Sequence, residues 1–311
     1  MAYQTGTANN PNDLLDKVRV FAIGQGWTVN SWAVRSDGGG AGGWCLALQK
    51  GDLHVALYTD LTTPAGDNPG QYIGGYLFPT WSSAHGNMAQ PNKSHNIATN
   101  GLGASAYTAY HLFGGAEHVH VVVEINPGTY KHFGFGRLRR LGAYNTGGYV
   151  YMSNWHMSSS LRSDFMSVNH AVPFDAYPYN TPIYSYSTIV RADSDSISPR
   201  YIYCPESHST QNNMMCGIRD GNETLPILQC PASSITGRAV LWPILTSARR
   251  ISGLFSSIGQ PPDMRWVRLD YLNPGDTLTL GTDEWMVFPI IRKNGGVGEV
   301  NSGTYGIAYR K

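Results

Sequence analysis

The chain has 311 residues, and only 14% of them are charged, against about 25% in an average globular protein. Its net charge of +1, with Arg137, Arg139 and Arg140 as the densest basic cluster, argues against specific nucleic-acid binding. The first residues are polar and no run of about 18 apolar residues occurs, so we expect neither a secretory leader nor a membrane span.

The first predicted element is an amphipathic helix over residues 11–23. Asn10 is a favourable N-cap and Pro11 suits the first helical position. Asp13 follows in the first turn, where the helix dipole favours an acidic side chain. Apolar side chains recur at helical spacing from Leu14 to Ala22, and two glycines then end the helix.

Beyond the helix, the chain alternates short apolar runs with Gly- and Pro-rich turns, which is typical of β-strands. The strongest signal spans residues 118–136, where β-branched and aromatic side chains flank an Asn-Pro-Gly turn. A second hairpin is predicted at residues 44–58, around a Lys-Gly-Asp turn. Further β-type segments lie at residues 27–32, 72–78, 144–151, 187–192, 200–203, 238–244, 277–293 and 303–311.

Three polar segments interrupt this pattern, at about residues 80–103, 153–187 and 205–231. Loops of this length are usually functional or lie against a partner. The sequence therefore predicts a mainly β protein with one N-terminal amphipathic helix, antiparallel sheets in a sandwich-like arrangement and long irregular loops. No linker is evident, so we expect a single β-rich unit over residues 1–311.

Motifs typical of enzymes are missing from the sequence. It has no nucleophile elbow, no zinc-protease motif, no phosphate-binding loop and no complete dinucleotide-binding glycine pattern. The four cysteines form no C-x-x-C pair, so thiols are expected, although a disulfide among Cys204, Cys216 and Cys230 stays open. We expect no catalytic residue and no cofactor.

His118 and His120 are the candidate metal ligands. Strand alternation places both imidazoles on one face, and three such pairs on a three-fold axis would supply six nitrogens. The valines that follow indicate a buried strand and nearby carboxylates are sparse, so we favour core histidines and expect no metal. Asp193 and Asp195 lack the glycine and distal glutamate of a calcium loop and are interpreted as a turn.

Aromatic side chains in the polar segments are candidates for contacting a carbohydrate or a protein partner. Such residues also serve in cores and subunit contacts, which is the commoner use. The candidates are Trp81, Trp155, Tyr177, Tyr179, Tyr184 and Tyr186.

Eight short phrases are distributed along most of the chain, at residues 1–8, 13–17, 26–30, 121–136, 190–196, 237–244, 284–293 and 302–311. As a set, they resemble a family of tailed-bacteriophage virion structural proteins. The resemblance implies membership of the particle and brings no catalytic residues.

Together, the resemblance and the low charge predict a structural component of the tail or baseplate, assembled in the host bacterial cytoplasm and located in the virion. The expected partners are other virion proteins (tail tube, baseplate or fibre components) and further copies in three- or six-fold symmetry. The alternatives are a host-receptor or glycan-binding tail-tip protein, a head decoration protein, and a cell-wall or capsule hydrolase.

Overall fold

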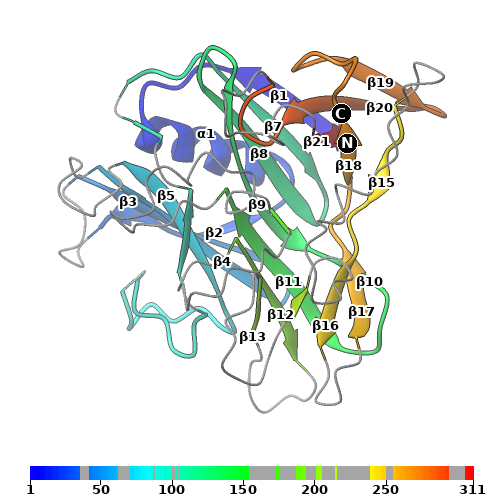
Figure 1. Cartoon of the computed structure of the whole chain (residues 1–311). Coiled ribbons are helices and arrows are strands. Elements are labelled where there is room, and N and C mark those ends of the chain that lie inside the picture. The colour runs from blue at the N-terminus through cyan, green and yellow to red at the C-terminus, as the bar shows by residue number, and fades with distance from the viewer. Residues whose placement is uncertain are drawn as a thin grey trace, which may run out of the picture.

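The computed structural model of the chain (Figure 1) describes residues 1–35, 42–61, 71–86, 88–94, 96–99, 102–103, 105–153, 173–174, 187–193, 201–204, 214–215, 239–249, 255–293 and 305–311. Within these residues the chain forms one α-helix and 21 strands. The strands build four antiparallel sheets, and none of them closes into a barrel. The predicted class, mainly β with one N-terminal helix, is confirmed.

The helix α1 (Pro11–Gly24) begins and ends where the sequence predicts, to within one residue. The Asn10 side chain accepts a hydrogen bond from the backbone N–H of Asp13 at 3.0 Å, which caps the first turn. Leu14, Leu15 and Val18 are fully buried on one face. The helix is therefore held by its apolar stripe, which packs into the core shared by two sheets.

The N-terminal sheet lies against α1. In spatial order it consists of β2 (Thr28–Val34), β3 (Trp44–Lys50), β4 (Leu53–Asp60), β5 (Tyr72–Phe78) and β6 (Ile97–Thr99). The predicted hairpin is confirmed as β3 and β4, with Leu46 opposite Leu57. The predicted loop at 80–103 is wrong at its end, because Ile97 and Thr99 pair with β5 there. A strand of only three residues, within a segment rich in Asn, Gly and Ser, is too short to show the alternation of a strand in the sequence.

The central sheet has seven strands. Their spatial order is β1 (Ala2–Gly6), β7 (Ala109–Gly115), β8 (His118–Asn126), β9 (Thr129–Arg137), β11 (Asn145–Met152), β12 (Thr188–Asp193) and β13 (Tyr201–Cys204). The hairpin predicted at 118–136 is confirmed as β8 and β9. The sequence pattern does not predict β1 or β7, which pair with each other over five residues of β1.

The C-terminal part of the chain builds the other two sheets. The C-terminal sheet runs β15 (Trp242–Pro243), β18 (Met264–Arg268), β21 (Tyr305–Arg310), β20 (Asp283–Pro289) and β19 (Thr277–Leu280). The small sheet runs β10 (Arg139–Arg140), β17 (Phe255–Gln260), β16 (Thr246–Arg249) and β14 (Met214–Met215). The segment predicted at 277–293 is a hairpin, because Gly281, with φ +64°, turns the chain between β19 and β20. The strand predicted at 238–244 is reduced to the two residues of β15.

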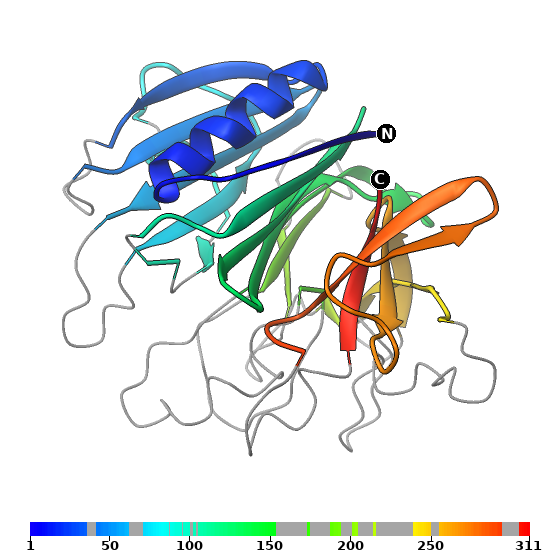
Figure 2. The same cartoon turned by 90° about the horizontal axis from the view of Figure 1, so that it is seen from above.

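The central sheet is covered on both faces, as Figure 2 shows. Val119, Val121 and Val123 of β8 face the core shared with α1 and the N-terminal sheet. Val122, one residue out of phase, faces a second core shared with the C-terminal sheet. This two-sided burial explains the nearly continuous apolar run of β8, since neither face of the strand meets water.

Most of the predicted loops at 153–187 and 205–231 lie outside the described residues. In the part of the chain that the structure describes, no helix has the length and apolar character needed to cross a membrane.

Candidate functional site

Only one of the six aromatic candidates can be placed. Trp81 lies just after β5, half-buried against the outer face of the N-terminal sheet, the face turned away from α1. Trp155, Tyr177, Tyr179, Tyr184 and Tyr186 lie outside the described residues.

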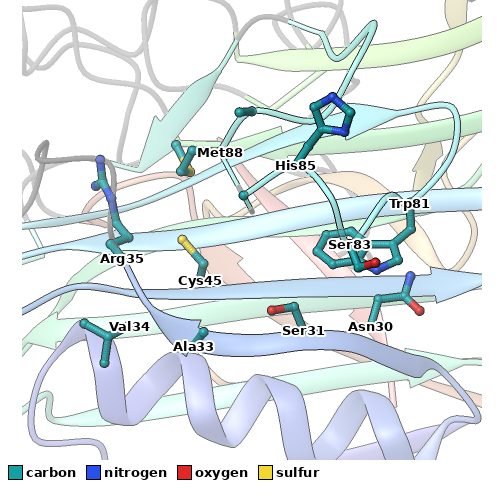
Figure 3. Close-up of a pocket in the computed structure, with 12 residues that line it drawn as sticks. Asn30, Ser31, Ala33, Val34, Arg35, Cys45, Trp81, Ser83, His85 and Met88 are labelled. Atoms are coloured by element: carbon teal, nitrogen blue, oxygen red, sulfur yellow. The ribbon is translucent and has the colours of Figure 1, made fainter.

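Trp81 lines a pocket of about 540 Å³ on the outer face of the N-terminal sheet (Figure 3), which we call the Trp81 pocket. Figure 3 shows Asn30 and Trp81 toward one end, and Arg35 and Met88 toward the other. The residues that line the pocket come from β2, β3 and the segment after β5, and they are Asn30, Ser31, Ala33, Val34, Arg35, Cys45, Trp81, Ser83, His85, Gly86, Met88 and Ala89.

The floor of the pocket consists of small side chains. Ala33 lies directly opposite Cys45 in the β2–β3 ladder, and Ser31 lies opposite Ala47. Cys45 and Ala47 are buried on the same face as the much larger Tyr76 and Phe78. The difference in side-chain volume along this face leaves open space above the small residues.

Gln90 holds the wall of the pocket in shape. Its side chain is only 3% exposed, and its Nε2 donates to the backbone oxygens of Ser82 and His85, both at 3.0 Å. Its Oε1 accepts from the backbone N–H of Ser82 at 2.9 Å. A further backbone bond joins the N–H of Ala89 to the oxygen of Gly86 at 2.9 Å. The wall is thus preformed by local hydrogen bonds.

Arg35 brings a positive charge to the pocket, but this charge is compensated. Its Nη1 lies 3.3 Å from Oδ2 of Asp60, and both side chains are about 95% buried, at 5% and 4% exposure. The guanidinium also lies 5.0 Å from the ring centroid of Tyr58. A paired and stacked guanidinium anchors the end of β2 and leaves the pocket close to neutral.

The candidate metal ligands lie far from this pocket, between the central and C-terminal sheets. As predicted, the rings of His118 and His120 share one face, with centroids 4.7 Å apart. Nε2 of His120 donates to the oxygen of Pro262 at 2.8 Å, so its Nδ1 accepts from the hydroxyl of Tyr151 at 3.0 Å. Burial lowers the pKa of His120 to about 3. Both nitrogens are therefore committed to protein partners.

His118 has a looser environment. Its Nε2 lies 3.5 Å from Oδ2 of Asp263, and burial lowers its pKa to about 4. The described residues contain no group of three or more His, Cys, Asp or Glu side chains that could hold a metal ion. The observed geometry is that of core histidines packed among aromatic rings.

Sequence reasoning did not single out a third buried histidine in the same layer. Nε2 of His132 donates to the oxygen of Pro289 at 2.9 Å, and its Nδ1 accepts from the hydroxyl of Tyr309 at 2.8 Å. Burial lowers its pKa to about 4. His120 and His132 thus each connect the central sheet to a backbone oxygen of the C-terminal part of the chain.

The Trp81 pocket therefore combines an aromatic side chain, several neutral polar groups and a compensated charge, which are features of small-molecule binding sites. The lining residues Arg35 and Asn30, and Gln90 in the wall, carry no sequence signal, because their roles depend on contacts made in the folded chain. No family of known proteins matches the chain, and no curated protein is significantly similar to it in sequence.

Proposed function

We propose that the chain is a structural protein of a tailed-bacteriophage particle, located in the tail or baseplate, that binds other virion proteins and further copies of itself. The phrases that resemble virion structural proteins support the proposed membership of the particle. The low content of charged residues supports a surface that is covered in an assembly.

The observation that carries the proposal is an exposed apolar segment at one edge of the C-terminal sheet. Val240, Trp242 and Leu245 lie within six residues of each other and are 41%, 40% and 41% exposed. Trp is enriched at protein interfaces, and exposed apolar groups of this kind typically mark contacts. The segment also overlaps one of the phrases of the resemblance, at residues 237–244.

The edge itself favours contact through side chains over strand addition. β15 has only two residues, and Pro243 has no backbone N–H to offer to a further strand. A partner would therefore cover Trp242 and Leu245 with its own apolar side chains. No residue is assigned a catalytic role in this proposal.

Mass spectrometry of purified particles, combined with immunogold electron microscopy, tests the proposal. We expect the chain to be present in particles, with label at the tail or its tip. Absence from particles, despite abundance in the infected-cell lysate, would contradict particle membership. Label confined to heads would contradict the tail position and favour the decoration alternative.

A further inference from the structure

We infer that the Trp81 pocket binds one ring of a neutral saccharide. This site goes beyond the proposed structural role, and its test is independent of whether the chain is found in particles. The volume of about 540 Å³ falls within the range of about 300–1,000 Å³ that small-molecule sites occupy.

The indole of Trp81 provides the apolar surface that such a ligand needs. It is half-buried and packs against Phe78, with ring centroids 6.2 Å apart. An aromatic ring fixed from behind offers its remaining surface at little cost in side-chain entropy. The C–H face of a sugar ring is apolar and flat enough to pack on such a surface.

Neutral polar side chains surround the indole. The hydroxyls of Ser31 and Ser83 line the pocket, and each can both donate and accept a hydrogen bond. Nδ2 of Asn30 donates to Oε1 of Gln49 at 3.2 Å, which orients an amide that carries a second N–H and a carbonyl oxygen. These donors and acceptors match the hydroxyl groups of a sugar.

The charges of the pocket favour a neutral ligand over an anionic one. Arg35 lines the pocket, but Asp60 and the ring of Tyr58 already engage its guanidinium. An anion would have to compete with the buried Asp60 for this cation, which is costly in a low-dielectric setting. A neutral ring requires no such exchange.

The wall of the pocket is preformed, which favours a ligand that binds without folding the protein around it. Gln90 fixes the backbone of Ser82 and His85, so little loop entropy is lost on binding. Because the pocket stays open to solvent on one side, only weak binding is expected for a single ring.

Ligand-observed NMR and titration calorimetry on the full chain test the inference, with methyl glycosides of glucose, galactose, mannose and N-acetylglucosamine as probes. We expect at least one glycoside to bind with a Kd of about 1 mM. Trp81→Ala should weaken that binding at least about tenfold. Asn30→Ala, which removes no core packing, should weaken it about three- to tenfold.

The matched control is Tyr271→Ala, which removes an aromatic side chain that is 66% exposed and does not line the pocket, and it should leave binding unchanged. The inference is overturned if no glycoside binds, or if Asn30→Ala and a folded Trp81→Ala both bind as the wild type does. If a polysaccharide made of the same sugar also binds, the natural ligand is a sugar unit of a polymer. If only the glycoside binds, the natural ligand is the free sugar. Both outcomes support a saccharide site in the Trp81 pocket.

Discussion

Gln90 shapes the Trp81 pocket from behind the segment that forms its wall. Three of its hydrogen bonds go to the backbone of Ser82 and His85. Each such bond contributes about 1 kcal/mol net, and a buried group that loses its partner costs about 1–3 kcal/mol. A buried amide thus supplies three of the hydrogen bonds that hold the wall, beside its local backbone bonds.

We predict that Gln90→Leu lowers the free energy of unfolding by about 1–3 kcal/mol, because buried backbone groups of the wall lose their partners. Urea denaturation measures this change. Hydrogen exchange at residues 82–86 should also accelerate. Gln4→Leu is the control, since Gln4 is exposed and bonds Tyr110 on the central sheet, and it should leave exchange in the wall unchanged. Unchanged exchange in Gln90→Leu would contradict the assigned role.

The buried histidines predict sensitivity to acid. Burial holds the pKa of His120 at about 3 and that of His132 at about 4, whereas an unfolded histidine titrates near 6.5. As the pH falls from about 6.5 toward 4, the unfolded chain therefore binds protons that the folded chain does not. The free energy of unfolding should fall over this window by about 2–3 kcal/mol for each such histidine at most.

Urea denaturation at several pH values, on the wild type and on His132→Gln, measures this effect. Glutamine can replace both hydrogen bonds of His132 and does not titrate, so the variant should lose less stability between pH 6.5 and 4. The control is Gln4→Leu, which keeps every histidine and should lose as much stability as the wild type between pH 6.5 and 4. Equal slopes for wild type and His132→Gln would contradict the account.

Individual residues could be predicted only where they carry a local signal. The Asn10 cap and the common face of His118 and His120 follow from spacing alone, and both are observed. Trp81 was a candidate because a tryptophan in a polar segment is unusual. Gln90 and Arg35 carry no such signal. Gln90 bonds the backbone of Ser82 and His85 within an irregular segment that has no regular sequence pattern. Arg35 acquires its role from Asp60, 25 residues later in the chain.

At the scale of elements, strands with strong apolar content could be predicted and pairing partners could not. The β8–β9 hairpin stands out because both faces of β8 are buried. β1 is polar, and it becomes a strand by pairing with β7, more than a hundred residues away. Ladders of this kind depend on tertiary contacts that a local pattern does not contain.

Gly134 in β9 tests how closely β9 packs against its neighbours β8 and β11, because the space around its Cα is small. A Cβ atom there would lie 2.6 Å from the backbone oxygen of Val119 and 2.8 Å from Cε1 of Tyr151. We predict that Gly134→Ala lowers the free energy of unfolding by about 1–3 kcal/mol through overpacking. Urea denaturation measures it, with Gly24→Ala as the control, since a Cβ atom meets nothing within 4 Å at Gly24. Similar stability of the two variants would contradict the packing of β8, β9 and β11.

At the scale of the whole molecule, the sheets pack around apolar clusters made by this chain alone. The central sheet is buried on both faces, so the chain has a proper core of its own. The low content of charged residues and the exposed apolar side chains are therefore features of the surface, where partners would bind. The number of sheets and their order were not predictable, because they follow from which apolar faces meet across the fold.

We predict that Trp242→Ser with Leu245→Ser reduces incorporation of the chain into particles at least about tenfold, since apolar anchors dominate interface energies. Quantitative mass spectrometry of particles made with each variant measures incorporation. The control is Val20→Ser, which removes an exposed apolar side chain from α1, 53% exposed, and should be incorporated normally. Full incorporation of a folded double variant would exclude this edge as the contact.

We propose that this chain is a tail or baseplate protein whose surface is covered by neighbouring subunits. A cryo-EM map of the intact particle tests it most directly. We predict density for this fold in the tail or baseplate, in symmetric copies, with Trp242 and Leu245 covered by an adjacent subunit. A map in which every tail and baseplate density is accounted for by other proteins would contradict the claim.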